Sequence, residues 1–520
     1  MIEPSVADWS VGCWMPRSAS LGALRASARR SLLLGASQSL ASLAELAAQG
    51  GLSLPRVDGA ADSLCQRPLI LTGHQPVIFH PGLVYKYQVA EAHAASCGGT
   101  AVAIVIDTDE GDPGQFAVPL VSDSAVSDPA AVEFASRQES FSAGGGLYAE
   151  SRLASRFERE AVVARVSAGL AAAGCVEAAG AFCEPASRYL QLPEMRMWAA
   201  NTIVRRLSGI GARMFELPLT AVCRLPESLR FFAGVLSRAK DFHATYNKVL
   251  NGWRTKQGIR NEANPFPNLR SAGTAIELPF WLVDLASGRR SIVWLHEGAA
   301  GLSLGTESGA VTELTWGCEA ETLLMLGLRG QLLVPRGALI TASLRLLFGD
   351  LFVHGLGGGH YDPATDELIR GWWQEEPPPF AVASASSCLF PGQRNQLRQL
   401  EEFRQQYRDL QFNPGRYLDG GLFEATEAAE LRGLLERKQV AVEELQRSRN
   451  AGVSGRETGR RIQQLSDTIR SRVAAIFENR VQAAEGISEE TVRTIESRTW
   501  PWFYFHSNWQ LQSDSNRPEM

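Results

Sequence analysis

The sequence LILTGHQPVIFHPGLVYKYQVAEAHAASCGGTAVAIVIDTDEGD, residues 69–112, decides the fold. It opens with a short apolar run at 69–71 that stops at Thr72-Gly73, continues with a helical pattern over 83–95, and closes with a second apolar run over 101–106. Short apolar runs that stop at Gly or polar residues are typical of buried parallel strands. A strand, a helix and a strand within about 40 residues form the βαβ unit of a parallel sheet, with a right-handed crossover. We therefore predict an α/β fold with a Rossmann-like parallel sheet core.

The regions around this unit divide the rest of the chain. Residues 1–66 are expected to form an N-terminal helical segment, because 18–50 are rich in Ala and Leu at helical spacing. Residues 67–420 are assigned to the core, with helical insertions between residues 120 and 330. Further strands are expected at 280–283 and 292–295, as a hairpin, and at 332–334 and 351–354, with a helix over 337–348.

The C-terminal region has a different composition. Residues 421–490 are rich in Glu, Arg, Gln and Leu, and apolar side chains recur every three or four residues on both sides of a Gly-containing break at 450–455. This pattern predicts a C-terminal antiparallel coiled-coil hairpin. Such a hairpin can pack within one chain or between two, and we favour a homodimer formed through it. Residues 491–520, with many aromatic side chains at 500–509, are expected to pack back on the core.

Composition argues against several classes of protein. The chain has 520 residues, of which 45% are hydrophobic and 21% charged, as in ordinary globular proteins. A net charge of −5, without a block of Lys or Arg, argues against a nucleic-acid partner. The sequence has no apolar stretch of about 20 residues and no signal-peptide pattern. We therefore expect no membrane partner and a cytoplasmic location.

The cysteines and histidines do not form a metal-binding pattern. The eight Cys residues are scattered, without a C-x-x-C pair or zinc-ribbon spacing. Scattered Cys fit buried thiols in a reducing compartment. We therefore expect no metal ligands among the site residues.

The first candidate site is the turn after the first strand, Thr72-Gly73-His74-Gln75. In open α/β sheets, ligands bind at the carboxyl ends of the strands. Gly73 permits close approach of the backbone, and the following helix offers free N–H groups to a phosphate or carboxylate. His74 can bind a phosphate oxygen or transfer a proton. His80 and Lys86 add donors, although the two His residues could equally serve only to hold the turn.

The second candidate is the acidic cluster after the second strand, Asp107-Thr108-Asp109-Glu110-Gly111-Asp112. Carboxylates this close repel one another unless each is hydrogen-bonded, paired or facing a cation. They could accept from a ribose or an amine, hold Mg²⁺, or act as a general base. Asp107 and Asp109 are the favoured members because they lie nearest the strand end; helix capping in a solvated loop is the alternative.

The third candidate is His354-Gly355-Leu356-Gly357-Gly358-Gly359-His360-Tyr361-Asp362, a Gly run between two His residues and followed by an Asp, which ends another short apolar run. Consecutive Gly residues leave the backbone bare enough to enclose a phosphate, although many such runs are only flexible turns. We expect His354, Gly357, Gly358 and Gly359 to bind a cofactor, together with Thr72, Gly73, Gln75 and His80. Three polar or Gly-rich loops that each follow a predicted parallel strand indicate one site at one edge of the sheet.

These loops resemble those of the bacillithiol biosynthesis cysteine-adding enzyme (BshC) family. Thr72-Gly73-His74-Gln75 and the segment 81–86, Pro-Gly-Leu-Val-Tyr-Lys, look like the family's T-G-Q-Q turn and G-P-L-Y…K helix. Asp107-Thr108-Asp109-Glu110 occupies the place of its acidic E-D-H-D cluster, and Pro335-Arg336 precedes a strand and a Gly-rich loop as in the family. The resemblance implies a nucleotidyltransferase-type core with a coiled coil, and a ligase that joins cysteine to the amine of glucosaminyl malate.

Three functions follow as hypotheses. The first is a BshC-like ligase that joins a small carboxylate to an amine, with His74, Lys86, Asp107 and Asp109 as catalytic residues. The second is a nucleotidyltransferase that activates a small acid or sugar phosphate without ligation. The third is a non-enzymatic ligand-binding or scaffold protein dimerised by its coiled coil. The partner in the first two is a small molecule, and the cofactor is left open between ATP, another nucleotide and none, with Mg²⁺ as the candidate ion.

Overall fold

The computed structural model describes residues 13–121, 133–261, 263–298, 301–485 and 487–505. The described residues form two compact units. The first comprises those within Met1–Val118, Arg137–Ser387 and Arg498–Met520, and the second those within Pro119–Ser136 and Cys388–Ser497. Among the described residues, no helix has both the length and the apolar character needed to cross a lipid bilayer.

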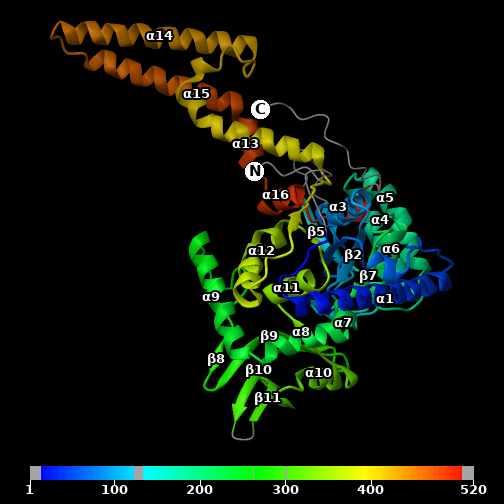
Figure 1. The fold of residues 1–520 in the computed structure, drawn as a ribbon. Helices are drawn as coiled ribbons and strands as arrows, with labels where there is room; N and C mark the ends of the chain where they lie inside the picture. The colour runs from blue at the N-terminus through cyan, green and yellow to red at the C-terminus, as the bar shows by residue number, and fades with distance from the viewer. Residues whose placement is uncertain (1–12, 122–132, 262, 299–300, 486, 506–520) are drawn as a thin grey trace. The chain divides into compact units, whose positions relative to one another are not determined.

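A five-stranded parallel sheet forms the centre of the first unit (Figure 1). Its order is β15-β14-β1-β2-β7, and every neighbouring pair is parallel. The strands are β1 (Leu69–His74), β2 (Thr100–Val105), β7 (Phe215–Pro218), β14 (Leu351–His354) and β15 (Phe380–Val382). The strands predicted at 69–71, 101–106 and 351–354 are therefore confirmed as three adjacent strands of one parallel sheet.

Helices cover this sheet because its strands are apolar on both faces. α3 (Pro81–Ser96) makes the crossover from β1 to β2 and packs on both strands. α11 (Ala338–Leu347) and α12 (Leu356–Leu368) precede and follow β14. α1 (Ala19–Gln49) begins at the Ser18 cap, ends at Gly50 and packs on β7 and α11, so the N-terminal segment belongs to the same unit as the sheet.

A second, antiparallel sheet belongs to the same unit. β9 (Ala275–Asp284) and β10 (Arg289–Gly298) form the expected hairpin. The predicted strand at 332–334 lies in β13 (Gln331–Pro335), but it pairs antiparallel with β9 rather than joining the parallel sheet. The range 120–330 is not wholly insertion either, because β7 within it is a strand of the parallel sheet.

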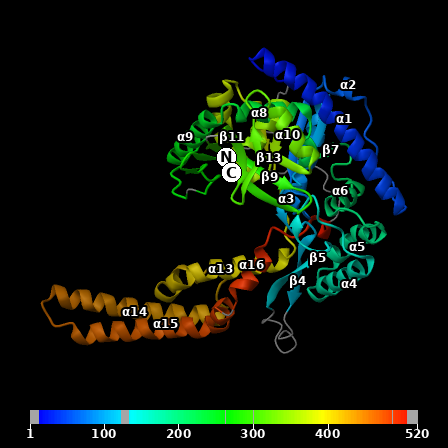
Figure 2. The same cartoon turned by 90° about the horizontal axis from the view of Figure 1, so that it is seen from below.

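The remaining elements of the first unit fill the connections; Figure 2 shows α4, α5 and α6 near one another. They are α2 (Ala61–Leu64), β3 (Glu110–Gly111), β6 (Gly146–Leu147), α4 (Arg156–Ala172), α5 (Val176–Gln191), α6 (Met197–Leu207), α7 (Leu219–Val222), α8 (Pro226–Leu236), α9 (Ala239–Gln257), β8 (Ser271–Ala272), β11 (Gly301–Thr306), β12 (Gly309–Leu314) and α10 (Glu319–Leu328). β4 (Gln115–Val121) pairs with β5 (Phe134–Ser140) in a separate two-stranded sheet.

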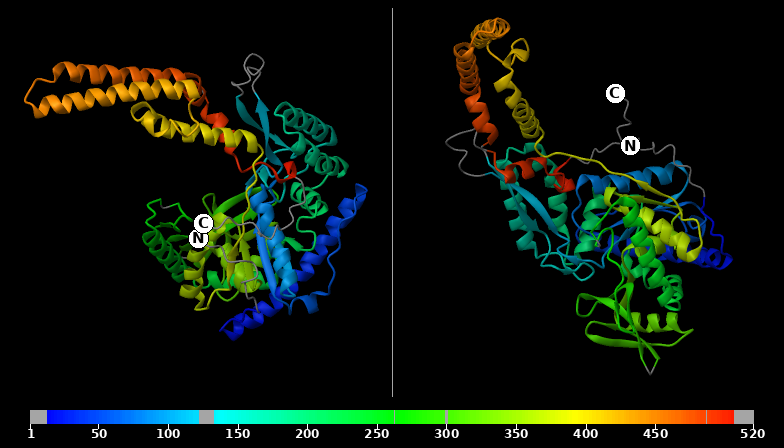
Figure 3. Two further views of the ribbon diagram at one scale, coloured as in Figure 1. Left: turned by 90° about the horizontal axis from the view of Figure 1, so that it is seen from above. Right: turned by 90° about the vertical axis from the view of Figure 1, so that its left-hand side faces the viewer.

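The second unit is helical. α14 (Ala425–Asn450) and α15 (Arg456–Glu485) run side by side in opposite directions (Figure 3). α13 (Pro391–Phe412) packs on α15, and α16 (Glu489–Glu496) packs on α13. Phe403 and Leu410 of α13 share an apolar cluster with Phe477 of α15, so the second unit includes α13 as well as the two helices within the expected hairpin range 421–490.

The described part of the aromatic C-terminal segment packs on the first unit. Trp500, Trp502, Phe503 and Tyr504 are buried. Phe503 packs edge-on against Phe116 with their ring centres 5.1 Å apart. Of the expected tail 491–520, residues 491–497 belong to the second unit, residues 500–504 pack within the first, and 506–520 lie outside the described residues.

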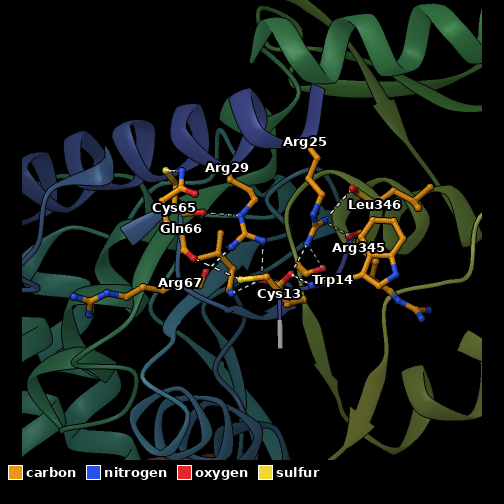
Figure 4. A network of polar contacts seen from close by, with 12 residues as sticks. Cys13, Trp14, Arg25, Arg29, Cys65, Gln66, Arg67, Arg345 and Leu346 are labelled. Carbon is orange, nitrogen blue, oxygen red and sulfur yellow. Dashed lines mark hydrogen bonds and ion pairs between the residues drawn. The ribbon is translucent and has the colours of Figure 1, made fainter. Parts of the chain in front are cut away.

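A buried carboxylate joins α1 to the starts of two central strands. Asp350 is fully buried directly before β14, and its oxygens accept from Nη2 of Arg25 at 2.8 Å and Nη1 of Arg29 at 2.6 Å. They also accept from the backbone N–H groups of Trp14 and of Leu69, the first residue of β1. Figure 4 shows Arg25 and Arg29 reaching down from the same helix into this network.

We predict that Asp350→Ala destabilises the protein by about 3–5 kcal/mol, because two buried guanidinium groups lose their counter-ion. Urea denaturation of the variant and the wild type measures the difference. The matched control is Asp62→Ala. Asp62 of α2 is the exposed partner of Arg30, which lies on α1 like Arg25 and Arg29, and its removal should leave the denaturation midpoint unchanged. Equal midpoints for Asp350→Ala and the wild type would contradict the role of this carboxylate.

Candidate functional site

The carboxyl ends of β1 and β14 lie next to each other where the strand order reverses. From β1 the chain proceeds through β2 to β7 on one side, then returns to β14 and β15 on the other. Ligands of open parallel sheets bind in the crevice at such a reversal. A pocket of about 350 Å³ lies there, which is within the range of small-molecule sites, about 300–1,000 Å³.

We call this cavity the β1–β14 pocket. It is lined by Gly73, His74, Gln75, Ile106, Thr108, Asp109, Phe266, Trp281, Arg290, Pro335, Gly337, Ile340, Thr341, Leu344, Phe352, His354, Gly358, Tyr361 and Asp362. The turn after β1, the acidic cluster after β2 and the segment after β14 thus all contribute to one pocket, as the sequence predicts. Of the remaining predicted site residues, Thr72, His80, Lys86, Asp107, Gly357 and Gly359 do not line it.

His74 lines the pocket as a neutral side chain. Burial, with the nearby charge of Lys86, lowers the pKa of His74 to about 3. Its Nδ1 lies 3.2 Å from the carbonyl oxygen of Gln75, which assigns the ring proton to Nδ1 and leaves Nε2 as an acceptor. At neutral pH, His74 can therefore accept a hydrogen bond but offers no positive charge to a phosphate.

Lys86 hydrogen-bonds to the backbone at the end of β1 and does not line the pocket. Its Nζ donates to the carbonyl oxygen of Gly73 at 2.6 Å, and the side chain is buried. Burial lowers the pKa of Lys86 to about 7. The expected catalytic role, a cation next to the substrate, does not match this position; the geometry makes Lys86 a residue that holds the Gly73–His74 turn.

Three other predicted residues serve the fold. Asp107 is buried, and its carboxylate accepts from the backbone N–H and the hydroxyl of Thr220 at 3.0 and 2.5 Å. Burial raises the pKa of Asp107 to about 6, although the Thr220 hydrogen bonds oppose the rise. Thr72 donates from its hydroxyl to the carbonyl of Val353, joining β1 to β14. His80 caps α3 by accepting from the N–H of Gly82 at 3.1 Å.

Asp109 is the member of the acidic cluster that lines the pocket. Its Oδ2 accepts from Nε2 of Gln75 at 2.8 Å, and its Oδ1 pairs with Arg290. The neighbouring Glu110 accepts from the backbone N–H of Arg290, and Asp112 from that of Gly114. Each of these carboxylates thus has at least one hydrogen-bond or ion-pair partner within the chain, and Arg290 serves both Asp109 and Glu110, which reduces their mutual repulsion.

A chain of three polar side chains lies behind the end of β14. His354 Nε2 is 2.9 Å from Oδ2 of Asp362, and the same oxygen accepts from Nη1 of Arg345 at 2.6 Å. Burial would raise the pKa of Asp362, but the His354 hydrogen bond and the Arg345 charge together hold it below its usual value. Asp362 is therefore a carboxylate, which can only accept, so His354 donates from Nε2.

The Gly run after β14 is the first turn of α12 rather than the expected loop. A Cβ at Gly358 would lie 2.5 Å from His354 Nδ1, and one at Gly359 would lie 2.2 Å from a methyl carbon of Val382. Close packing of the helix on β14 and β15 therefore requires these two glycines. A Cβ at Gly357 would meet nothing within 4 Å, so packing does not explain that position.

The antiparallel sheet contributes pocket residues that no sequence motif indicated. Trp281 of β9 and Arg290 of β10 both line the pocket, and the Arg290 guanidinium lies 4.6 Å from the centre of the Trp281 ring. Arg336, at the end of β13, also lies over this ring, 5.0 Å from its centre. Alternation along β9 and β10 shows which side chains share one face of the hairpin. No local sequence signal places Trp281 and Arg290 beside Asp109.

The described residues contain no group of three or more His, Cys, Asp or Glu side chains arranged to hold a metal ion. Comparison with models of known protein families gave no match, and comparison with curated proteins gave none either.

The lowered pKa of Lys86 predicts a pH-dependent contribution to stability. In the folded state the pKa is about 7, below the ordinary value of 10.5. Below pH 7 the Lys86 amine is protonated in both the folded and the unfolded protein. Between pH 7 and 10.5 the unfolded protein binds more protons, so the free energy of unfolding rises by up to about 1.4 kcal/mol per pH unit. Relative to Lys86→Met, the wild type should gain stability from pH 7 to pH 9, measured by urea unfolding of both proteins. A difference in unfolding free energy between the two proteins that stays constant from pH 7 to pH 9 would contradict the prediction.

The different surroundings of Gly357 and Gly358 predict different effects of substitution by Ala on thermal stability. We expect Gly358→Ala to displace the His354 ring and lower thermal stability. Gly357→Ala is the matched control in the same helical turn, and it should be neutral or stabilising by up to about 1 kcal/mol. Calorimetric melting of the two variants makes the comparison. If both melt at the same temperature, packing against His354 is not what Gly358 provides.

Proposed function

We propose that the protein is a BshC-like ligase that joins a small carboxylic acid to the amine of a second small molecule, after a nucleotide has activated the acid. The observation that carries this proposal is the meeting of three predicted segments at one pocket. The ends of β1 and β14 and the turn after β2 contribute His74, His354 and Asp109 to it. These are also the segments that carry the resemblance to the family.

The strand order supports a Rossmann-type core for this ligase. Numbered by their sequence within the parallel sheet, the strands lie in the order 5-4-1-2-3. This is the order of the dinucleotide-binding fold without its sixth strand, read from the opposite edge. The first residues of α12 offer backbone N–H groups beside the pocket, a favourable position for a phosphate or carboxylate.

The charges of the pocket favour a role for Arg290 rather than His74 or Lys86 in binding an anion. His74 is neutral at pH 7, and Lys86 donates to Gly73 instead of lining the cavity. Arg290 lines the cavity, and its planar guanidinium, which pairs with Asp109, has further donors suited to a phosphate or carboxylate. Aromatic and apolar side chains, including Trp281, line much of the cavity, and such low-polarity surroundings strengthen charge interactions.

The coiled coil is part of the same proposal. Leu431 and Leu434 of α14 and Ile469 and Val473 of α15 are buried in one apolar cluster, as heptad positions require. The ion pairs Arg461–Glu444 and Arg472–Glu430 cross between the helices. We propose an antiparallel coiled-coil hairpin formed within one chain.

The test supplies the substrates of the resembled family. The protein is incubated with ATP, Mg²⁺, cysteine and glucosaminyl malate, and mass spectrometry is used to look for the amide alongside a pyrophosphate assay. We expect an amide product, and a loss of about 100-fold in kcat/KM for Arg290→Ala, as for removal of one charge-stabilising donor. The matched control is Arg289→Ala, which alters an exposed neighbour on the opposite face of the same strand.

Other outcomes separate the alternatives. Pyrophosphate release that does not depend on the amine would favour a nucleotidyltransferase. No product, together with a melting temperature unchanged by ATP, cysteine or Mg²⁺, would favour a non-enzymatic scaffold protein. Equal loss of activity in Arg289→Ala and Arg290→Ala would contradict the role of the pocket.

A further inference from the structure

His354 is the lining histidine with the best-defined orientation. It lies at the end of β14, and its ring packs on Phe352 with the centres 4.4 Å apart and edge-on to Phe380 at 5.7 Å. Its Nε2 donates to Asp362, whose side chain is nearly fully buried. Three contacts on different sides therefore fix both the position and the rotation of the imidazole.

Arg345 fixes Asp362 in turn. The Arg345 guanidinium is fully buried, donates from Nε to the carbonyl of Pro378 at 2.9 Å, and pairs with Asp366 at 2.7 Å. These bonds hold the Arg345 guanidinium against the carbonyl of Pro378 and against Asp366, which lies one turn beyond Asp362 on α12. The carboxylate is thus held in its ionised form, and His354 is held in the tautomer with its proton on Nε2.

The other ring nitrogen of His354 remains available. Nδ1 has no hydrogen-bond partner in the part of the chain that the structure describes. It lies beside Gly358, which itself lines the β1–β14 pocket. A pocket-lining imidazole that is oriented by a carboxylate at one nitrogen and has no partner among the described residues at the other is the arrangement of a general base.

We propose that His354 is the catalytic residue that takes the proton from the amine nucleophile, with Asp362 and Arg345 as positioning residues. This inference rests on the proposed ligase function. The amine lone pair attacks the carbonyl carbon of the nucleotide-activated acid, forming the C–N bond. The bond from that carbon to the phosphate oxygen breaks, its electron pair leaves with the nucleoside monophosphate, and the N–H proton passes to Nδ1 and then to water.

The other polar groups of the pocket fit this role less well. The low pKa of His74 makes it a weak base at neutral pH. Asp109 already pairs with Arg290 and accepts from Gln75. His354 is therefore the lining group with both a free basic nitrogen and a partner that stabilises the imidazolium.

The experiment measures amide formation from cysteine and glucosaminyl malate with ATP and Mg²⁺ by wild type, His354→Gln and Asp362→Asn. We expect His354→Gln to lower kcat about 100- to 1,000-fold with little change in KM, and to remove the acidic limb of the pH–rate profile. Asp362→Asn should lower kcat by a smaller factor and shift that limb. Imidazole added to His354→Ala should restore part of the rate.

The control is His360→Gln, which should keep the wild-type rate. His360 is an exposed histidine of α12, the helix that carries Asp362, and it does not line the pocket. Melting temperatures establish that each variant folds. If the wild type forms amide and His354→Gln keeps its rate and pH profile, the proton-transfer role is overturned while the ligase proposal stands. If the wild type forms no amide from these substrates, the ligase proposal itself fails.

Discussion

The buried Asp350 carboxylate is the interaction on which the arrangement of the first unit depends. It accepts four hydrogen bonds, from Arg25 and Arg29 of α1 and from the backbone of Trp14 and Leu69. Asp350 directly precedes β14, and Leu69 begins β1. One side chain thus ties together the starts of the two strands whose opposite ends carry the site. A buried ion is stable only when every charge and donor around it is matched. The Asp350 contacts therefore permit few other arrangements of α1, β1 and β14.

The same physical solution recurs elsewhere in the unit. Glu216 of β7 is buried between Arg205 and Arg206 of α6, at 2.6 and 3.0 Å. Behind the pocket, Arg345 is buried against Asp362. In each place an arginine reaches out of a helix to a carboxylate on or beside the parallel sheet or on a neighbouring helix. Because breaking such a pair leaves an uncompensated charge, these contacts favour one arrangement of helices over nearby ones.

The β1–β14 pocket is built by two sheets of different kinds. The parallel sheet provides backbone turns and the side chains at its carboxyl edge, among them His74 and His354. The antiparallel sheet provides Trp281 and Arg290, and the Arg290–Asp109 ion pair joins the two. The parallel sheet therefore provides the turns on one side of the cavity, while the antiparallel sheet provides a cation and an aromatic side chain.

The sequence by itself determined three adjacent strands of the parallel sheet and the edge of that sheet at which the candidate pocket lies. Apolar runs that end at Gly or polar residues are local signals, and they located β1, β2 and β14; parallel strands must then place their following residues at one edge. Only the tertiary structure decided which polar groups face the pocket. Lys86 and Asp107 turn towards backbone and Thr220 partners, while Arg290 arrives from a hairpin far along the chain. Burial also made His74 neutral. These outcomes depend on contacts between segments distant in sequence, and a local pattern carries no information about such contacts.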